Sequence, residues 1–159
     1  MRLDSESRRM RFSGTVSDKF IENYGETAFR INTVIHGYFE DDLLRAAAEL
    51  RPISDIWPIQ AEAAFSVEKQ WQNTGIGTAL MDRTLLSARN RAIKTLYMVC
   101  LADNSRMRSI ARKHDAKLHF EPGAITADLE PSWPSYFSML EETMEDGNGF
   151  VTAILERAS

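Results

Sequence analysis

The chain has 159 residues, a length that suits one domain, since a chain near ~150 residues buries about 68–70% of its unfolded surface. A formal net charge of −4 gives no basic excess, so nucleic acid is not an expected partner. The single cysteine, Cys100, excludes an internal disulfide, and the scattered histidines show no metal-site spacing. Residues 1–11 are too charged for a signal peptide, and no apolar run reaches membrane-spanning length. We therefore expect a cytoplasmic protein with no metal and no membrane segment.

The first part of the chain predicts a helix followed by a hairpin. Ser17 and Asp18 precede apolar residues at helical spacing, which is typical of a short capped helix. Residues 29–39 are rich in β-branched and aromatic side chains, and residues 43–50 follow them after an acidic turn. The second of these segments could also be a helix when it is considered alone. The prolines in residues 52–58 predict a loop.

The middle of the chain predicts alternating strands and helices. Residues 61–68 alternate in polarity like a strand, and residues 76–91 repeat apolar side chains at helical spacing. Residues 96–101 are continuously apolar, as in a buried strand, and residues 103–105 cap a basic helix. Two more strands and a tail follow: 117–120, 124–129, a helical 135–146 and an apolar 150–155. This order indicates a mixed α/β fold around one sheet, with helices able to cover both faces.

The segment between the strand at 61–68 and the next helix has the composition of a phosphate-binding loop. Gly75 and Gly77 let the backbone approach an anion where the free amides of a helix N-terminus point outward. A dinucleotide fingerprint needs a third glycine, but Leu80 stands there, and no Gly-Lys-Ser/Thr run of a P-loop exists. Considered alone, the two glycines therefore have two possible interpretations: they form a phosphate-binding loop, or they only permit a tight turn between strand and helix.

The pattern Gln72-x-x-Gly75-x-Gly77, between an alternating strand and an amphipathic helix, resembles the Gln/Arg-x-x-Gly-x-Gly/Ala signature of the GNAT N-acetyltransferase superfamily. Residues 5–12, with Ser-Arg and then Arg-Phe, further resemble the opening of bacterial protein-lysine-acetyltransferase GNAT modules. The similarity covers residues 61–120 well, fades in 20–58, and has no counterpart for 131–159.

This resemblance implies one GNAT domain over residues 1–159, with 131–159 as a C-terminal helical extension. It also implies a mixed, mostly antiparallel sheet with helices on both faces and a splayed pair of central strands. The implied cofactor is acetyl-CoA. The positions matching the family's cofactor-binding residues are Phe65, Ser66, Val67, Gln72, Thr74, Gly75, Ile76, Gly77, Thr78, Asn104 and Met107. For Asn104 a helix N-cap is an equally good interpretation, and both can hold. Arg106 or Arg108 are candidates for the 3′-phosphate, although a solvated helix face is the default.

The resemblance assigns the general base to Glu62, which matches the catalytic glutamate of lysine-acetylating members. Its neighbours on the same strand face, Ala64 and Ser66, are small and leave room for a substrate. Partial burial would tune a carboxyl toward this role, whereas the simpler interpretation is a solvated strand glutamate. Glu68 is the weaker alternative, expected at the surface.

Many GNAT enzymes carry a tyrosine that protonates the departing thiolate, and Ala111 occupies the matching position here. Water or another hydroxyl, from Tyr38, Tyr97 or Tyr136, would have to serve, or turnover would be slow. His36, His114 and Cys100 are expected to be structural, and core packing is the favoured role of Trp57 and Trp71.

These residues predict transfer of an acetyl group from acetyl-CoA to a primary amine, on a protein lysine or a small molecule, by direct attack. The alternative is a non-catalytic acyl-CoA-binding regulatory or interaction module, which Ala111 favours; a nucleotide-binding protein is a third reading. In the tail, residues 135–146 and 150–155 each show an apolar helical stripe. We expect this tail to cover the acceptor side, to contact a second subunit in a homodimer, or to pack on its own core.

Overall fold

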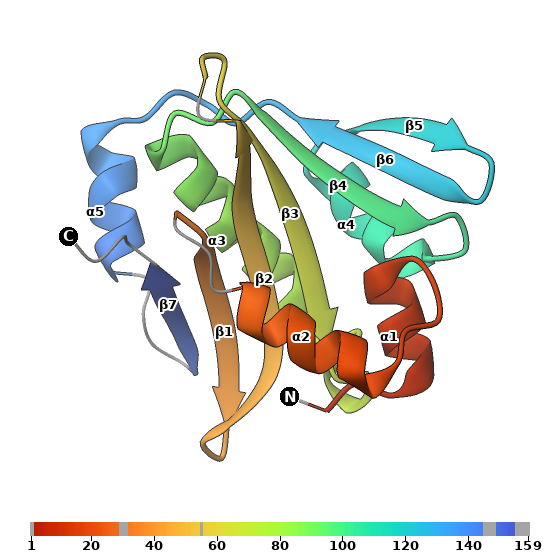
Figure 1. Ribbon diagram of the computed structural model, residues 1–159. Coiled ribbons are helices and arrows are strands. Elements are labelled where there is room, and N and C mark those ends of the chain that lie inside the picture. Colours follow the sequence, from red (N-terminus) through yellow and green to blue (C-terminus); the bar gives the residue numbers. More distant parts are fainter. Residues whose placement is uncertain (1, 29–31, 55, 145–148, 155–159) are drawn as a thin grey trace.

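Seven strands form one sheet in the computed structural model, which describes residues 2–28, 32–54, 56–144 and 149–154 (Figure 1). The strands lie in the order β5-β6-β4-β3-β2-β1-β7. Their bounds are Val34–Glu40 (β1), Leu43–Ser54 (β2), Gln60–Val67 (β3), Thr95–Leu101 (β4), Lys117–Glu121 (β5), Ala124–Leu129 (β6) and Phe150–Ile154 (β7). Every strand pair is antiparallel except β3 and β4, so the predicted mixed, mostly antiparallel sheet is confirmed.

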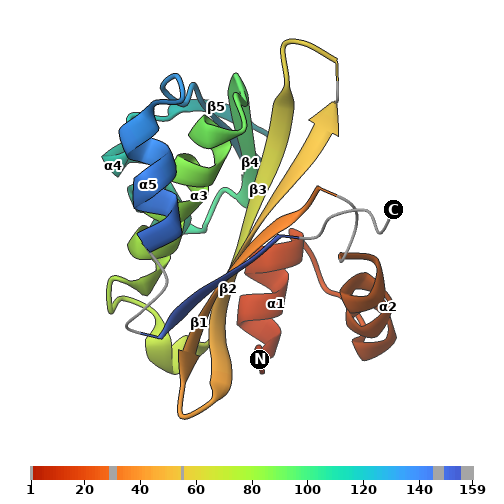
Figure 2. The same ribbon diagram turned by 90° about the vertical axis from the view of Figure 1, so that its left-hand side faces the viewer.

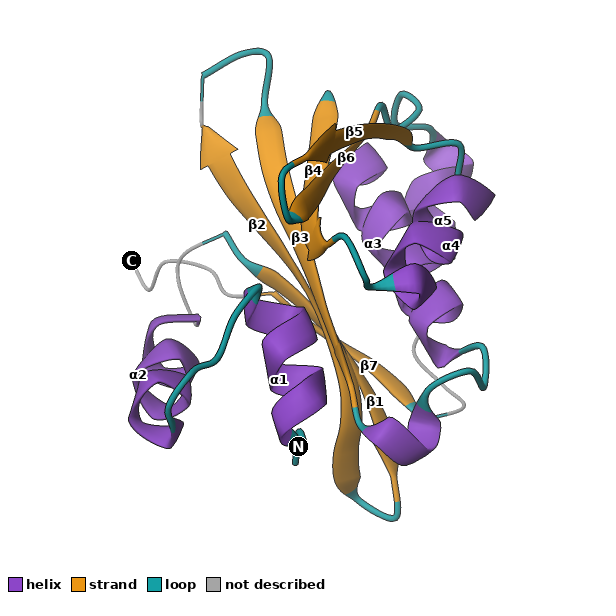
Figure 3. Cartoon of the chain, turned by 90° about the vertical axis from the view of Figure 1, so that its right-hand side faces the viewer, coloured by secondary structure: helices purple, strands orange, loops and turns teal. Residues whose placement is uncertain are grey.

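Helices cover both faces of this sheet, as predicted (Figures 2 and 3). The α-helices are Ser5–Phe12 (α1), Asp18–Ala28 (α2), Ile76–Asn90 (α3), Ser105–Lys113 (α4) and Tyr136–Met144 (α5). Helices α1 and α2 lie on one face, and α3, α4 and α5 lie on the other. The main core sits between the sheet and α3, where Leu50, Leu80, Met81 and Leu96 are fully buried.

The two central strands diverge soon after they meet. Strands β3 and β4 are paired only from Gln60 to Glu62 and from Thr95 to Tyr97. Beyond these residues β3 continues beside β2, while β4 continues beside β6. Figure 1 shows the resulting wedge, which opens toward α1. The splayed pair of strands is therefore confirmed, and it creates the space in which the site is built.

Two features of the first half of the chain differ from the sequence prediction. Helix α1 was not expected, because its residues are mostly polar. Asp4 caps its N-terminus, because the Asp4 carboxylate accepts a hydrogen bond from the Ser7 amide at 2.7 Å. Strand β2 also continues through Pro52, where a loop was predicted. The register shifts between Pro52 and Ser54, and a bulge of this kind tolerates the missing N–H of proline.

The C-terminal segment is not helical throughout, and this part of the prediction is wrong. Helix α5 is present, but the apolar stripe expected from residue 150 onward forms strand β7 instead. Strand β7 pairs with β1 from Tyr38 opposite Phe150 to Val34 opposite Ile154. A short aromatic and β-branched segment beside an open strand gains a full hydrogen-bond ladder, which a single helical turn cannot match. Leu155 and the expected end of the helix at residues 145–146 lie outside the described residues.

In the described part of the chain, no helix has both the length and the apolar character needed to cross a membrane. The cytoplasmic location stays a prediction.

Candidate active site

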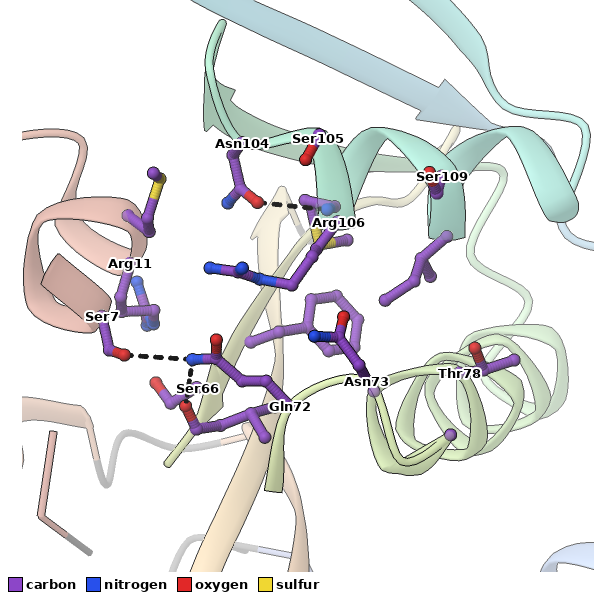
Figure 4. A pocket seen from close by; sticks show the side chains of 17 residues that line it. Ser7, Arg11, Ser66, Gln72, Asn73, Thr78, Asn104, Ser105, Arg106 and Ser109 are labelled. Atoms are coloured by element: carbon purple, nitrogen blue, oxygen red, sulfur yellow. Dashed lines mark hydrogen bonds between the residues drawn. The ribbon is translucent and has the colours of Figure 1, made fainter. Parts of the chain in front are cut away.

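A cavity of about 590 Å³ lies in the wedge between β3 and β4, bordered by α1, α4 and the loop that enters α3 (Figure 4). Of the predicted cofactor-binding positions, it brings together Phe65, Ser66, Val67, Gln72, Gly75, Gly77, Thr78, Asn104 and Met107. Thr74 and Ile76 do not line it. Thr74 donates its hydroxyl to the Trp71 carbonyl at 2.6 Å, and the Ile76 side chain is buried in the core.

The loop entering α3 presents unpaired backbone amides to this cavity. Gly75 has a φ of +92°, a left-handed conformation that glycine adopts without steric cost, and it caps the helix. The first amide of this turn to bond back to a carbonyl is that of Ala79, which donates to Gly75 at 3.0 Å. The amides of Gly77 and Thr78 therefore precede the helical ladder, at the positive end of the helix dipole. This arrangement suits a phosphate group.

Gly77 stands where α3 comes close to α4. A Cβ atom added there would lie 3.1 Å from Cδ1 of Ile110, a side chain that also lines the cavity. The missing side chain thus leaves room between the two helices beside the loop that enters α3.

Gln72 lines the cavity, and its side-chain amide also holds the loop in place. Its Nε2 donates to the Val67 carbonyl and to the Ser7 hydroxyl, both at 3.0 Å (Figure 4). The loop is thereby joined to the end of β3 and to α1. Ser7 was noted in the sequence only as part of the resemblance, because a contact across 65 residues leaves no local pattern.

The cavity is lined by cations and not by anions. Arg11 and Arg106 line it, and the described lining contains no Asp or Glu. The exposed Arg106 side chain extends across the cavity toward Gln72 (Figure 4). A ligand with several phosphate charges fits this balance, because each charge would find a cation or a free amide within the same space. Arg108, the other residue considered for the 3′-phosphate, does not line the cavity.

Strand β3 offers a free backbone edge to the same space. Phe65, Ser66 and Val67 pair with β2 on one side, while on the other side β4 has diverged and the Val67 carbonyl accepts a hydrogen bond from Gln72. An extended ligand arm that carries amide groups could hydrogen-bond to this edge as an added strand does. Across the wedge, Asn104 accepts a hydrogen bond from the Met107 amide at 3.1 Å. The predicted helix cap is therefore confirmed, and both residues also line the cavity.

A smaller cavity of about 180 Å³ adjoins the first. The residues that line both are Met10, Arg11, Phe65, Asn104 and Met107. Glu62 lines only the smaller cavity, together with Ala64 from the same strand. The two spaces therefore meet at one junction, with the Glu62 carboxylate on the side away from the phosphate loop.

Glu62 is held by a cation that sequence analysis did not identify. Arg51 stands opposite it in the β2–β3 register, and Arg51 Nη2 donates to Glu62 Oε2 at 2.8 Å. The hydrogen bond to Glu62 raises the pKa of Arg51, against an opposing effect of burial. About a third of each side chain is exposed (35% for Arg51 and 33% for Glu62). The solvated glutamate considered from the sequence is thus a half-buried ion pair at a cavity.

A second charged group lies beside this pair. Arg11 Nη2 donates to the Tyr24 hydroxyl at 2.7 Å and to Glu49 Oε1 at 3.0 Å. The Tyr24 hydroxyl donates to the other Glu49 oxygen at 2.5 Å. Burial is the main cause that raises the pKa of Tyr24. These contacts fix Arg11 at the junction of the two cavities.

The hydroxyls considered as replacements for the missing acid do not line either cavity. Ala111 is buried in the core. Tyr38 donates to Glu40 and packs on Trp71, while Tyr136 lies on α5. Tyr97 stands opposite Glu62 in the β3–β4 register but outside the cavity lining. Cys100 does line the smaller cavity, and burial raises the pKa of its thiol.

Glu68 is not the surface residue that was expected. It is buried and lies outside both cavities, and its carboxylate accepts from the Arg2 amide at 2.6 Å and from Arg45 at 3.3 Å. His36 is buried between Thr152 and Ser87, which agrees with a structural role. Trp71 packs on Tyr38 and Phe150 joins the same cluster, whereas Trp57 is exposed and stacks on Trp133.

Comparisons with known proteins agree with this architecture. The model of the acetyltransferase (GNAT) family matches residues 7–115. The structure is similar to the GNAT domain of S. lividans PAT, with a TM-score of 0.67 and 22% identity over 80% of this chain and 78% of that one. It is also similar to the ribosomal-protein-S18-alanine N-acetyltransferase from Escherichia coli, with a TM-score of 0.61 and 15% identity over 83% and 88%. A third similar structure is yncA from Salmonella typhimurium with its cofactor acetyl-CoA, with a TM-score of 0.60 and 13% identity over 76% and 78%.

The matched residues make up more than half of the chain and include most of α1, the wedge, the loop at Gly75 and α4. The chain therefore belongs to the acetyltransferase (GNAT) family.

Proposed function

We propose that this protein transfers the acetyl group of acetyl-CoA to a primary amine, with Glu62 as the general base. The observation that carries the proposal is the junction of the two cavities. A large space with phosphate-binding features meets a small space that contains a carboxylate, and the two share Arg11, Phe65 and Met107 among their walls.

The large cavity has groups for each part of acetyl-CoA. The amides that precede the α3 ladder, at Gly77 and Thr78, would donate to the pyrophosphate. Arg106 would pair with a phosphate at the cavity mouth. The free edge of β3 at Phe65–Val67 would hydrogen-bond to the amides of the pantetheine arm. The cofactor supplies the acetyl group in an activated form, as a thioester.

The small cavity would take the amine. Glu62 accepts a proton from the ammonium, so that the neutral nitrogen can bond to the acetyl carbon while the carbon–sulfur bond breaks and its electron pair stays on sulfur. The second proton that the nitrogen loses passes to water, which in turn protonates the thiolate. The Arg51 guanidinium donates a hydrogen bond to the Glu62 carboxylate at 2.8 Å, so an incoming ammonium competes with Arg51 for this carboxylate. Because both side chains are a third exposed, that exchange requires no opening of the core.

Arg11 is the group that replaces the missing tyrosine in this proposal. It lines both cavities, its hydrogen bonds to Tyr24 and Glu49 are donated by Nη2, and its guanidinium lies over the Phe12 and Tyr24 rings. The remaining donors of the guanidinium would stabilise the negative charge that develops on sulfur, so that water can supply the proton afterwards. No acid at position 111 is then needed.

The alternative is an acyl-CoA-binding module without catalysis, which the buried Ala111 favours. The decisive measurement is release of free CoA from acetyl-CoA in the presence of lysine peptides, polyamines or aminated antibiotics. Release with one amine class, abolished by Glu62→Gln, supports the enzyme. Binding of acetyl-CoA without release for any of these amines supports the module.

Cofactor binding itself is tested with Gly77→Val. The new side chain would first meet the flexible end of Ile110, so the fold should survive, which circular dichroism checks. We expect calorimetry to show at least about a tenfold loss of acetyl-CoA affinity, because the added bulk separates the backbone from the pyrophosphate. Unchanged affinity in the folded variant would remove the phosphate loop from the proposal.

Assembly as a homodimer also stays a prediction, which light scattering measures.

A further inference from the structure

Helix α5 packs against α3 through its polar side. Ser138 is 1% exposed, and Asn90 Nδ2 donates to its carbonyl at 2.9 Å. Glu142 accepts from Ser87 at 2.5 Å, from Arg91 at 2.7 Å and from Asn90 at 2.8 Å. The seam between these two helices is therefore made of hydrogen bonds and an ion pair.

The apolar side of α5 faces outward. At 100° per residue, Tyr136, Phe137, Leu140 and Met144 lie within an arc of about 100° that is centred opposite Ser138. All four side chains are exposed, and Phe137 and Met144 reach 81%. A helix at a protein surface ordinarily buries its apolar stripe and exposes its polar one. The arrangement in α5 is the reverse, so this face has the composition of a contact surface that the described residues leave exposed.

Helix α5 itself is acidic. It contains Glu141 and Glu142 and no Lys or Arg. Arg91 neutralises Glu142 at the seam, but Glu141 is exposed. The C-terminal end of the helix adds partial negative charge of its own.

A cavity of about 340 Å³ extends the surface toward β6. Its walls include Leu85 and Leu129, and its charged residues are Asp82, Glu130, Glu141, Arg89 and His114. Arg89 already donates to the Trp133 carbonyl at 2.7 Å and to Ser135 at 3.1 Å, and Lys117 pairs with Glu130 at 3.1 Å. Apolar walls with carboxylates nearby suit a long basic side chain, whose stem packs while its charged end stays among the acids.

We propose that the outward face of α5 is a docking surface for a basic, amphipathic segment of a partner protein. The four apolar side chains would cover the partner's apolar stripe, and the surrounding carboxylates would pair with its lysines or arginines. A second copy of this chain is a poorer occupant, because a two-fold contact would bring two acidic patches together. An anionic lipid surface is repelled by the same charges.

This surface is separate from the active site. None of the described residues that line the two cavities of the wedge belongs to α5, and α5 lies on the opposite face of the sheet from α1 (Figure 2). Docking on α5 should therefore leave acetyl transfer to a small amine unchanged, which separates this inference from the proposed function.

The test is binding of a fluorescent amphipathic peptide of leucine and lysine, measured by anisotropy. Its controls are a leucine–glutamate peptide of the same pattern and a serine–lysine peptide of the same charge. We expect binding of the first peptide alone, weakened by salt, and hydrogen-exchange protection confined to α5 and its seam with α3. The double variant Phe137→Ser, Leu140→Ser should lower the affinity at least about tenfold. Phe120→Ser, which removes a 67% exposed aromatic from β5, should change nothing.

Several results would overturn the proposal. Equal binding of the acidic peptide, or equal affinity of the double variant, would show that α5 does not select a basic partner. A dimer in light scattering that the double variant dissociates would assign the face to a second copy. Binding to anionic vesicles in place of the peptide would assign it to a membrane. If the double variant fails to fold, hydrogen exchange of the wild-type chain with the leucine–lysine peptide decides. Protection outside α5 and its seam with α3 would then contradict the proposal.

Discussion

Two glutamate–arginine pairs lie on opposite faces of the sheet and differ in what surrounds them. Arg51 and Glu62 meet at 2.8 Å on the side of α1, and Arg91 and Glu142 meet at 2.7 Å between α3 and α5. The Glu62 side chain is 33% exposed and borders a cavity, whereas the Glu142 side chain is 18% exposed and lies in a seam.

The hydrogen-bond environments of the two glutamates differ as much as their exposure. Glu142 accepts from Ser87 and Asn90 as well as from Arg91. Burial alone would raise the pKa of Glu142, but these three hydrogen-bond donors together hold it below its ordinary value of 4.5. A pair with one contact and a solvent path can be broken by a ligand, while a pair inside a network stabilises the fold. In the proposed function, the Arg51–Glu62 pair serves catalysis, whereas the similar Arg91–Glu142 pair stabilises the packing of α5.

The largest effect expected is on rate, from Glu62→Gln. The amide keeps the shape and a contact with Arg51 but cannot accept a proton, so turnover should fall by about 10²-fold or more. Acetyl-CoA affinity and the unfolding free energy should change little, because the pair is partly exposed. Steady-state kinetics, calorimetry and urea unfolding measure the three quantities. If Glu62→Gln lowered the stability but not the rate, Glu62 would be a structural residue and not the general base.

The next effect is on stability, from Glu142→Gln. Weakening a hydrogen-bonded charge in a closed seam should cost about 1–3 kcal/mol of unfolding free energy. Acetyl transfer by the folded protein should persist, because Glu142 lies outside the lining of both wedge cavities. Glu141→Gln on the exposed side of the same helix is the matched control, expected within about 0.5 kcal/mol of the parent. Equal costs for the two variants would show that the seam carries no special stability.

The dependence of stability on pH sharpens the same point. The pKa of Glu142 is lower in the folded than in the unfolded chain, so its contribution is present above the unfolded value of 4.5 and disappears as pH falls through the folded value. Unfolding experiments from about pH 6 to about pH 3 should therefore show a shallower acid limb in Glu142→Gln than in the parent. If the unfolding free energy of both proteins fell equally steeply with decreasing pH, the hydrogen bonds to Glu142 would not stabilise its charged form.

The smallest effect is expected at the mouth of the cofactor cavity. Arg106→Ala removes one exposed cation, worth about 1 kcal/mol in binding, or roughly a fivefold loss of acetyl-CoA affinity. The loss should shrink as salt is added, because the charge is exposed. Arg112→Ala, on the same helix but outside the cavity lining, is the control. Similar losses for both variants would mean that only the overall charge of α4 matters.

The sequence predicted those parts of the molecule whose signals are local. The strand at 61–68, the glycine turn and the helix after it are contiguous, so the polarity pattern predicted their order correctly, and the motif marked the loop that the proposed function assigns to phosphate. Helix α1 escaped notice because its own composition is polar. Contacts far along the chain hold it, including Arg9 with Asp103 at 2.6 Å and Ser7 with Gln72 at 3.0 Å.

The partners of the site residues could not be predicted for the same reason. Glu62 was identified by resemblance, but Arg51 reaches it only through the register of β2 and β3, which a single sequence does not specify. The tail shows a further limit. Periodicity predicted helix α5 correctly, yet it could not tell which side faces inward, because Ser87, Asn90 and Arg91 of the neighbouring helix region decide that.

The short pairing of β3 with β4 has a consequence for how the protein changes on binding its ligand. The pairing ends at Glu62 and Tyr97, and in the proposed function the extended arm of the ligand binds beside β3 beyond this point, as an additional strand does. Amides along Phe65–Val67 that exchange with solvent in the free protein would then become protected. Ligand binding would then complete the hydrogen bonding of β3, and hydrogen exchange of the individual amides would follow it.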